Sequence, residues 1–162
     1  MELKYTNKKG EIFTILIDEE DFKTISDYEW FVVKEDKTNY ATTRVFKNGK
    51  PASLLLHRLL IGVPGLDVDH INHNGLDNRR ENLRACSRSQ NLMNKRIETG
   101  ASSKFVGVFY NKINKNWNAY INAGGKRTRL GCFKNEHDAA KTRDNAALIL
   151  HGEFATLNFK TA

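Results

Sequence analysis

Residues 66–95 read LDVDHINHNGLDNRRENLRACSRSQNLMNK, and this polar stretch decides the fold of the middle of the chain. Its centre carries Asn74-Gly75, which is a strong turn signal. Farther along, Ser87 is followed three residues later by Gln90, a capping box that predicts a helix start at Ser87. Asn91 then lies in the first full turn of that helix. The stretch therefore predicts a strand, a polar loop, a short strand and a helix.

Four side chains suited to phosphate chemistry occur here at a telling spacing. Asp69 precedes His70, Asn82 follows the histidine by twelve residues (82 − 70), and Asn91 follows it by twenty-one (91 − 70). Over residues 56–94 the sequence resembles HNH endonucleases, most closely the phage-type homing endonucleases of the His-Asn-Asn variety. The resemblance implies a ββα-metal nuclease core that hydrolyses a phosphodiester bond of DNA.

Each of the four residues has a role in that chemistry, which needs an activated water and a cation at the phosphate. With an ordinary pKa of about 6.5, the imidazole of His70 is a competent general base near pH 7. The resemblance places the side-chain oxygen of Asn82 on this imidazole. It also makes Asp69 and Asn91 ligands of a divalent cation, Mg²⁺ or alternatively Mn²⁺. Arg88 lies three residues before Asn91, on the same helix face, where we expect it to hold the scissile phosphate.

The same residues also have simpler interpretations. A lone Asp-His pair in a loop is commonly a solvated turn, and Asn82 or Asn91 alone is commonly a cap. Because neighbours on a strand point to opposite faces, Asp69 and His70 share a site only where the strand ends or bends. His73, within the turn, is expected to be exposed rather than catalytic.

Two further features border the nuclease stretch. His57-Arg58 resembles the HR that precedes the core in this family, and we expect His57 to pack beneath the site and Arg58 to contact a phosphate. The chain has two cysteines, Cys86 and Cys132, so it lacks the paired cysteines of zinc-stabilised members. The flanking N-terminal sheet must therefore hold the small core.

The N-terminal third predicts a scaffold sheet. Segments 11–18, 28–33 and 40–46 are rich in β-branched and aromatic residues, which favours three antiparallel strands. The acidic residues 18–21 predict the start of a short helix, and residues 53–61 predict either a strand or a short helix. No chemistry is assigned to this part of the chain.

The C-terminal part predicts a second module. Segments 105–110, 117–122 and 126–133 are strand candidates separated by turns, and a helix is expected over 136–151, with Asn135 as its N-cap. The sequences SKFVGV, WNAYI, LGCF and the closing LNF resemble the Apetala-two domain of plant ethylene-response factors. The resemblance implies a three-stranded sheet that enters the DNA major groove with the helix packed behind it.

Strand alternation predicts which side chains of this sheet face DNA. If Ala119 and Ile121 face the helix, their neighbours face outward. The expected base contacts are Tyr120, Asn122, Arg127 and Arg129. The expected phosphate contacts are Lys112, Lys115 and Lys126. Residues 99–135 hold seven Lys or Arg and no Asp or Glu, which favours a polyanionic partner.

The predicted fold class is therefore α+β, in four parts. These are an N-terminal β-rich scaffold (1–55), a ββα-metal nuclease core (56–96), a linker (97–103) and an Apetala-two-like DNA-binding domain (104–160). With 162 residues and a net charge of +7, the chain suits compact modules that bind nucleic acid. Its longest apolar run is too short to span a bilayer, and its first residues do not resemble a secretory signal.

The function predicted from the sequence is a site-specific, metal-dependent DNA endonuclease that nicks or cleaves duplex DNA. We expect a monomer in the cytoplasm, with double-stranded DNA as partner, a divalent metal ion, no small-molecule cofactor and no membrane. The alternative is a non-catalytic, sequence-specific DNA-binding regulator with a vestigial HNH module. A protein that binds or cuts RNA is a third interpretation, because basic sheets also bind RNA.

Overall fold

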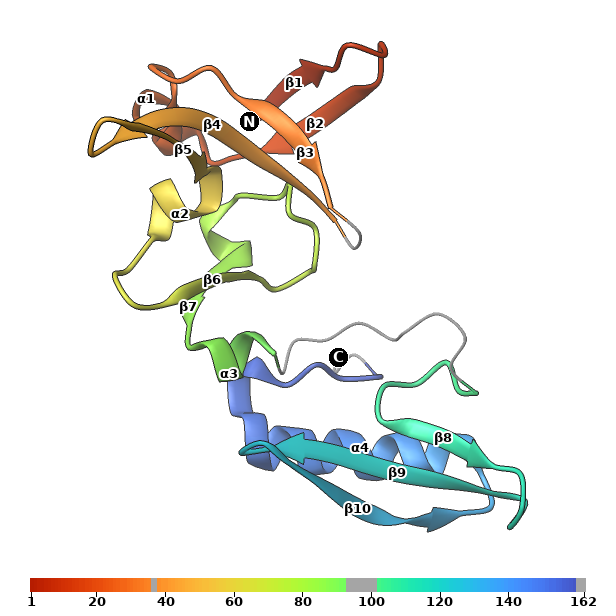
Figure 1. Cartoon of the computed structure of the whole chain (residues 1–162). Helices are drawn as coiled ribbons and strands as arrows, with labels where there is room; N and C mark the ends of the chain where they lie inside the picture. Colours follow the sequence, from red (N-terminus) through yellow and green to blue (C-terminus); the bar gives the residue numbers. More distant parts are fainter. Residues whose placement is uncertain (36–37, 93–101, 160–162) are drawn as a thin grey trace. The chain divides into compact units, whose positions relative to one another are not determined.

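The computed structural model describes residues 1–35, 38–92 and 102–159, and the chain forms two compact units, Met1–Ser87 and Arg88–Ala162 (Figure 1). Both units combine small antiparallel sheets with few helices, which confirms the predicted α+β class. No helix in the described ranges is long and apolar enough to cross a membrane.

The first unit begins with a two-stranded sheet that the sequence prediction merged with the next one. Strand β1 (Glu2–Thr6) pairs with β2 (Ile12–Leu16), and a 3-10 turn, η1 (Glu19–Asp21), leads into the short helix α1 (Phe22–Ile25). The predicted strand over 11–18 thus has β1 as its partner. The Asn7 side chain fixes the connecting turn, since its oxygen accepts hydrogen bonds from the amides of Lys9 and Glu11.

The second sheet has the order β3-β4-β5, with β3 (Phe31–Lys34), β4 (Asn39–Lys47) and β5 (Lys50–Leu55). Strand β5 runs directly into helix α2 (Leu56–Ile61), so the segment predicted as a strand or a helix is both in succession. The side chains of both sheets and α2 meet in one apolar core. Its buried members are Ile15, Ile17, Ile25, Ala41, Leu56 and Leu76.

The nuclease stretch forms a hairpin of β6 (Asp67–His70) and β7 (Leu83–Cys86), joined by a loop that ends in the 3-10 turn η2 (Arg80–Asn82). Strand β2 holds this loop through its backbone: the Leu16 amide donates to the Leu76 carbonyl, and the Asn78 amide donates to the Leu16 carbonyl, both at 2.8 Å. The scaffold is therefore hydrogen-bonded into the nuclease core, as the missing zinc ligands led us to expect.

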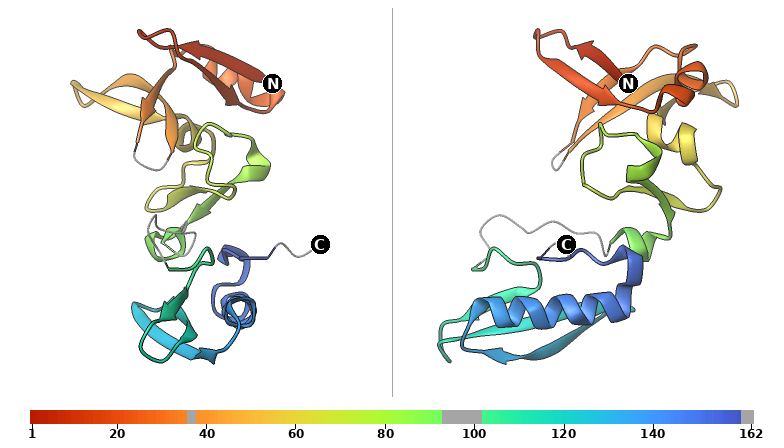
Figure 2. Two further views of the ribbon diagram at one scale, coloured as in Figure 1. Left: turned by 90° about the vertical axis from the view of Figure 1, so that its right-hand side faces the viewer. Right: turned by 180° about the vertical axis from the view of Figure 1, so that it is seen from behind.

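The second unit contains the short helix α3 (Arg88–Asn91), a sheet of order β10-β9-β8, and the long helix α4 (Glu136–His151) followed by η3 (Gly152–Phe154). The strands are β8 (Val108–Asn111), β9 (Asn116–Ala123) and β10 (Lys126–Phe133). Helix α4 lies along one face of the sheet (Figure 2). Buried Ala119, Ala139 and Ala140 allow this close approach.

Two sequence boundaries in this unit need correction. Strand β8 starts at Val108 instead of 105, because the Val108 amide turns back to the Phe105 carbonyl and Gly107 adopts a positive φ of 74°. Most of the expected linker, residues 97–101, lies outside the described residues. Its last residue, Ser103, is buried, and its hydroxyl donates to Glu136 and accepts the Phe105 amide. Ser103 therefore belongs to the folded unit.

Candidate nuclease site and DNA-binding sheet

His70 is the last residue of β6, so the Asp-His pair does lie where a strand ends. Its imidazole is buried, with 6% of its surface exposed. The ring of His57, from α2, packs edge-on against it with centroids 4.8 Å apart, and Tyr40, from β4, contacts both histidine rings. Side chains from two elements, α2 and β4, thus restrict the rotation of the imidazole.

Asn78 lies against the imidazole of His70. The Nε2 atom of His70 is 3.4 Å from the Oδ1 atom of the fully buried Asn78. Because an amide oxygen only accepts hydrogen bonds, this contact favours the tautomer that carries its proton on Nε2. Burial lowers the pKa of His70, while the Asn78 contact and the charges of Asp69 and Asp77 raise it in part. In this tautomer the lone pair lies on Nδ1, which is the atom at which the ring can accept a proton.

His57 is a neutral neighbour of this base. It is 4% exposed, and burial, followed by the charges of His70 and Arg58, lowers its pKa to about 3. Its Nδ1 atom has no hydrogen-bond partner among the described residues. His57 therefore packs beneath the site, as the sequence led us to expect, and adds no charge next to His70.

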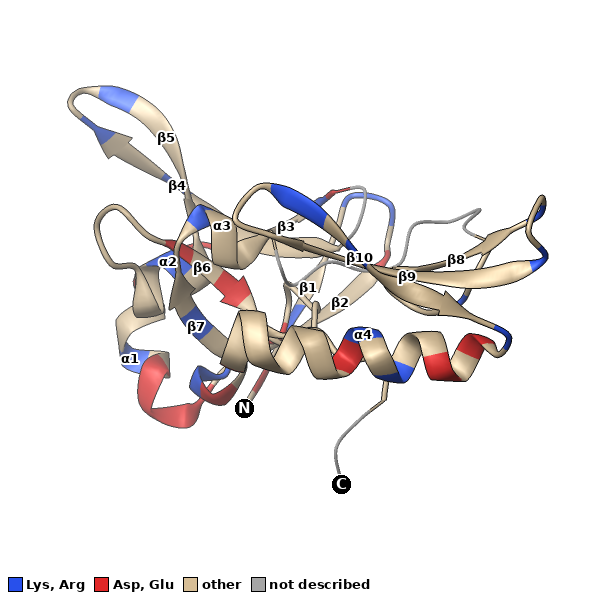
Figure 3. Ribbon diagram, turned by 90° about the horizontal axis from the view of Figure 1, so that it is seen from below, with Lys and Arg blue, Asp and Glu red and all other residues tan. Residues whose placement is uncertain are grey.

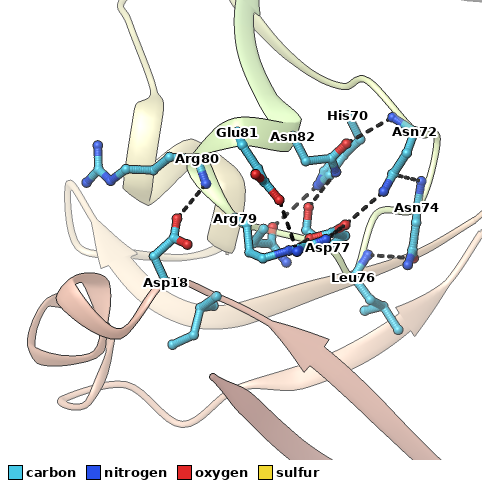
Figure 4. Close-up of polar contacts among 12 residues, drawn as sticks. Asp18, His70, Asn72, Asn74, Leu76, Asp77, Arg79, Arg80, Glu81 and Asn82 are labelled. Atoms are coloured by element: carbon cyan, nitrogen blue, oxygen red, sulfur yellow. Dashed lines mark hydrogen bonds and ion pairs between the residues drawn. The ribbon is translucent and has the colours of Figure 1, made fainter. Parts of the chain in front are cut away.

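Asn82 fixes the loop of the hairpin. The resemblance implied a hydrogen bond from its side-chain oxygen to the imidazole, but the side chain bonds the loop backbone instead. Its Oδ1 atom accepts the Asn72 amide at 2.9 Å, and its Nδ2 atom donates to the Asp77 carbonyl at 2.7 Å (Figure 4). The reason is geometric: the Asn82 side chain lies inside the loop, where two backbone groups need partners. In the structure Asn78 contacts the ring that Asn82 was expected to contact.

Asp77 strengthens the same loop. Its carboxylate is 2% exposed and accepts two hydrogen bonds from Arg79, each at 2.8 Å, and one from the Asn72 side chain. These donors, Arg79 first, lower the pKa of Asp77 despite its burial. The loop therefore keeps a negative charge within reach of His70 at neutral pH.

Asp69 pairs across the hairpin with Arg84. The Oδ2 atom of Asp69 accepts hydrogen bonds from Nε at 3.0 Å and Nη2 at 2.7 Å of Arg84, and both side chains are largely buried. The two residues stand opposite each other in the β6-β7 register. The ion pair holds the carboxylate in one orientation, which suits an oxygen ligand. The described residues contain no group of three or more His, Cys, Asp or Glu able to hold a metal.

The remaining predicted nuclease residues have different locations. Arg58, at the middle of α2, is exposed and makes a loose ion pair of 3.4 Å with Asp67. Arg88 and Asn91 are the first and last residues of α3, in the second unit. Their spacing on one helical turn is as predicted. The roles of all three stay predictions.

The outward face of the second unit's sheet carries two side-chain clusters. In the first, Tyr120 stacks on Phe109 with centroids 5.0 Å apart, and the Arg127 guanidinium lies 4.3 Å from the Tyr120 centroid. In the second, the buried side chain of Asn118 accepts a hydrogen bond from Arg129 at 2.8 Å, and Arg129 also contacts Cys132.

The predicted strand alternation is confirmed for β9. Ala119 and Ile121 are 0% and 3% exposed and face α4, whereas Asn122 is exposed. Arg127 stands opposite Asn122 and Arg129 opposite Tyr120 in the β9-β10 register. The four predicted base contacts therefore lie together. Lys126 is exposed at the start of β10, while Lys112 and Lys115 are exposed in the turn before β9.

Sequence reasoning missed three residues of these sites. Asn78 and Arg84 contact His70 and Asp69, and Asn118 fixes Arg129. The position of Arg84 follows from pairing Asp67–His70 with Leu83–Cys86, because that register sets it opposite Asp69. The sequence holds no comparable signal for Asn78, because its approach to His70 depends on the backbone bond from Leu16.

The chain order of these parts defines a class of protein. A buried Asp-His pair ends one strand of a hairpin, and a helix follows the other strand, as in ββα nucleases. Residues 56–93 match the family model described as HNH endonuclease. The chain is also 30% identical over 158 residues to an uncharacterized HNH endonuclease of Acanthamoeba polyphaga mimivirus, a match that covers 93% of this chain and 76% of that protein. The chain belongs to the HNH endonuclease family.

Proposed function

We propose that this chain is a metal-dependent, site-specific endonuclease that nicks or cleaves double-stranded DNA, and that it acts as a homing endonuclease. The observation that carries the proposal is the buried imidazole of His70, which Asn78, His57 and Tyr40 hold in one orientation. Family membership supports a nuclease, and the basic sheet supports a DNA partner.

His70 acts as the general base in this proposal. With Nε2–H directed at Asn78, its Nδ1 atom takes a proton from a water molecule, and the resulting hydroxide attacks the phosphorus. The bond from phosphorus to the 3′-oxygen then breaks, and the leaving alkoxide takes a proton from water, which gives a 3′-hydroxyl and a 5′-phosphate. The charges of Asp69 and Asp77 favour the protonated ring that results, and Asn78 keeps its hydrogen bond to either form.

The donor set fits a hard divalent cation. Asp69 supplies a carboxylate whose orientation Arg84 fixes, and we propose Asn91 as a second oxygen ligand. Mg²⁺ retains several waters and needs few protein ligands, so one carboxylate and one amide are sufficient, and Mn²⁺ accepts the same atoms. When bound, such a cation supplies charge neutralisation at the phosphate. Arg88 and Arg58 are proposed to contact the scissile and a neighbouring phosphate.

We propose that the sheet of the second unit selects the DNA site, as its resemblance to the Apetala-two domain suggests. Arg127 and Arg129 suit guanine, Asn122 suits adenine, and Tyr120 presents an aromatic ring beside them. Phosphate contacts by Lys112, Lys115 and Lys126 add affinity without sequence preference. The target sequence of the plant domain does not transfer, because acidic and Trp positions there are Tyr120 and Arg129 here.

The test uses supercoiled plasmid carrying candidate sites, incubated with the protein and Mg²⁺, with and without EDTA. We expect nicked or linear product only with the cation, and no product from His70→Ala, although this variant still binds DNA. The control is His73→Asn, in the same turn, because His73 has a positive φ of 62° that asparagine tolerates. Equal cleavage by His70→Ala and the parent protein would show that His70 is not the base.

A further inference from the structure

Part of the β4-β5 hairpin projects beyond its sheet. Strand β3 pairs with β4 only over residues 39–42, whereas β4 pairs with β5 over residues 42–47. The end of the hairpin, residues 43–54, is therefore a two-stranded ribbon that no other strand of the described residues joins (Figure 3). We call this segment the ribbon.

The tip of the ribbon has a fixed shape. Asn48 and Gly49 connect the strands with φ values of 53° and 74°, the conformation of a two-residue type I′ turn. Lys47 and Lys50 form the last cross-strand pair, and Phe46 stands opposite Pro51. A tight turn and paired strands hold these side chains in a set order, so the tip needs little ordering to bind a partner.

The tip combines an exposed aromatic ring with positive charge. Phe46 is 82% exposed, although it is one of the largest apolar side chains in the unit. Residues 39–55 include Arg44, Lys47 and Lys50 but no Asp or Glu. Because alternate residues share a face, Arg44 lies on the same face as Phe46, and the paired lysines lie on the other.

We propose that the ribbon is a second DNA-binding surface, in which Phe46 inserts as a wedge between neighbouring base pairs of duplex DNA from the minor groove. The inference rests on the proposed function, in that duplex DNA is the partner. Proteins that bind the minor groove use apolar side chains to separate base steps and cations to meet the flanking phosphates. The ribbon carries both: Arg44 shares the face of Phe46, and Lys47 and Lys50 lie on the other face, next along each strand toward the tip.

The ribbon belongs to the same compact unit as His70. Strand β5 continues directly into α2, which carries His57, and so into the unit that contains His70. A DNA strand held by the ribbon is thus held by the same compact unit as the general base. The basic sheet that we propose to select the site belongs to the other unit. The two surfaces therefore have separate tasks, selection and local distortion.

The experiment measures binding of the full chain to a fluorescent DNA duplex in EDTA, over a series of KCl concentrations. Each lost phosphate contact makes the slope of log K against log[KCl] shallower by about 0.9. We expect Lys47→Ala with Lys50→Ala to reduce the slope by about 1.8, and we expect no change from Lys8→Ala with Lys9→Ala, a matched pair in the turn of the β1-β2 hairpin.

Phe46→Ala tests the wedge separately. We expect it to leave the salt slope unchanged and to weaken binding by at least about fivefold. In duplexes that contain 2-aminopurine, the parent protein should raise the fluorescence by separating the base pairs, and Phe46→Ala should abolish this increase. Ile12→Ala, which truncates another exposed apolar side chain (67% exposed), serves as control. Circular dichroism checks that the variants are folded, which their surface positions favour.

The outcomes separate this inference from the proposed function. If Arg127→Ala with Arg129→Ala weakens binding while the ribbon variants behave like the parent protein, the ribbon does not bind DNA and the proposed function stands. If the parent protein does not bind duplex DNA, or if RNA displaces the duplex from the protein, both proposals are wrong.

Discussion

Replacing Asn82 by alanine tests whether this residue fixes the loop, as its contacts in the structure indicate. Asn82 is 6% exposed, and its side chain makes two short hydrogen bonds to backbone groups of the loop. Alanine removes both and leaves the Asn72 amide and the Asp77 carbonyl without these partners. We therefore expect the first unit to lose stability together with the geometry around His70.

The size of the loss follows from these contacts. A hydrogen bond contributes about 0.5–1.5 kcal/mol net, and a buried group left without a partner costs about 1–3 kcal/mol. The Asp77 carbonyl is buried in this contact, whereas the Asn72 amide is partly exposed. We expect the free energy of unfolding to fall by about 2–4 kcal/mol. With a urea m-value of about 1.5 kcal/mol per molar, the midpoint falls by about 2 M.

The assay is urea unfolding followed by tryptophan fluorescence. The chain has two tryptophans, Trp30 in the first unit and Trp117 in the second, so the Trp117→Phe background makes Trp30 the reporter of the first unit. Glu81→Ala serves as control: the neighbouring Glu81 makes an exposed ion pair with Arg79, and its loss is expected to change stability by less than about 1 kcal/mol.

A midpoint for Asn82→Ala that matches that of Glu81→Ala would refute the loop-fixing role. Cleavage adds a second measurement. If the loop positions His70, Asn82→Ala lowers the rate of DNA cleavage even in the absence of urea, where the protein remains folded. A variant that is destabilised as expected but cleaves at the parent rate would show that the loop geometry does not matter for the base.

Three further predictions concern other contacts. His57→Phe is expected to make the free energy of unfolding less dependent on pH in acid. The pKa of His57 is about 3 in the folded state and near 6.5 in the unfolded state, so His57 lowers stability by about 1.4 kcal/mol for each pH unit between 6.5 and 3 as the pH falls. Urea unfolding at several pH values measures this slope. An identical dependence would contradict this. Asn118→Val is expected to reduce discrimination at the base that we propose Arg129 to read. The effect should be non-additive with Arg129→Ala in a double-mutant cycle, and additive effects would show that Asn118 does not position the arginine. Arg80→Ala is expected to destabilise the first unit by about 1–2 kcal/mol, because buried Asp21 loses its partner in a half-exposed pair; an unchanged urea midpoint would exclude this.

Local signals predicted the elements that local interactions fix. Helix α4 has the predicted bounds of 136 and 151 because Asn135 accepts the His137 amide at its start and Gly152 follows its end with a positive φ of 54°. Strand β10 also has its predicted bounds, and strand alternation placed Ala119 and Ile121 against the helix. In each case the information lies within a few residues of the element.

Contacts between distant segments account for the errors. The contacts of Asn82 differ from the expected one because the strand β2 backbone shapes the loop, and the side chain then finds its partners at Asn72 and Asp77. The same tertiary contact brings Asn78 to His70. Strand β1 was overlooked because it is short and polar on one face, and its existence depends on pairing with β2.

The two backbone bonds between Leu16 and the loop also set a limit on how this nuclease can be rearranged. A fragment that starts at the family-matched region would leave the Leu76 carbonyl and the Asn78 amide without partners, and would expose the side of Leu76 that packs in the core. Transplanting the β6-β7 hairpin into another protein, or exchanging it between relatives, therefore requires the first two strands to be transferred with it. A crossover between relatives that falls between residues 16 and 78 would separate these partners, whereas a crossover after residue 87 would keep them together.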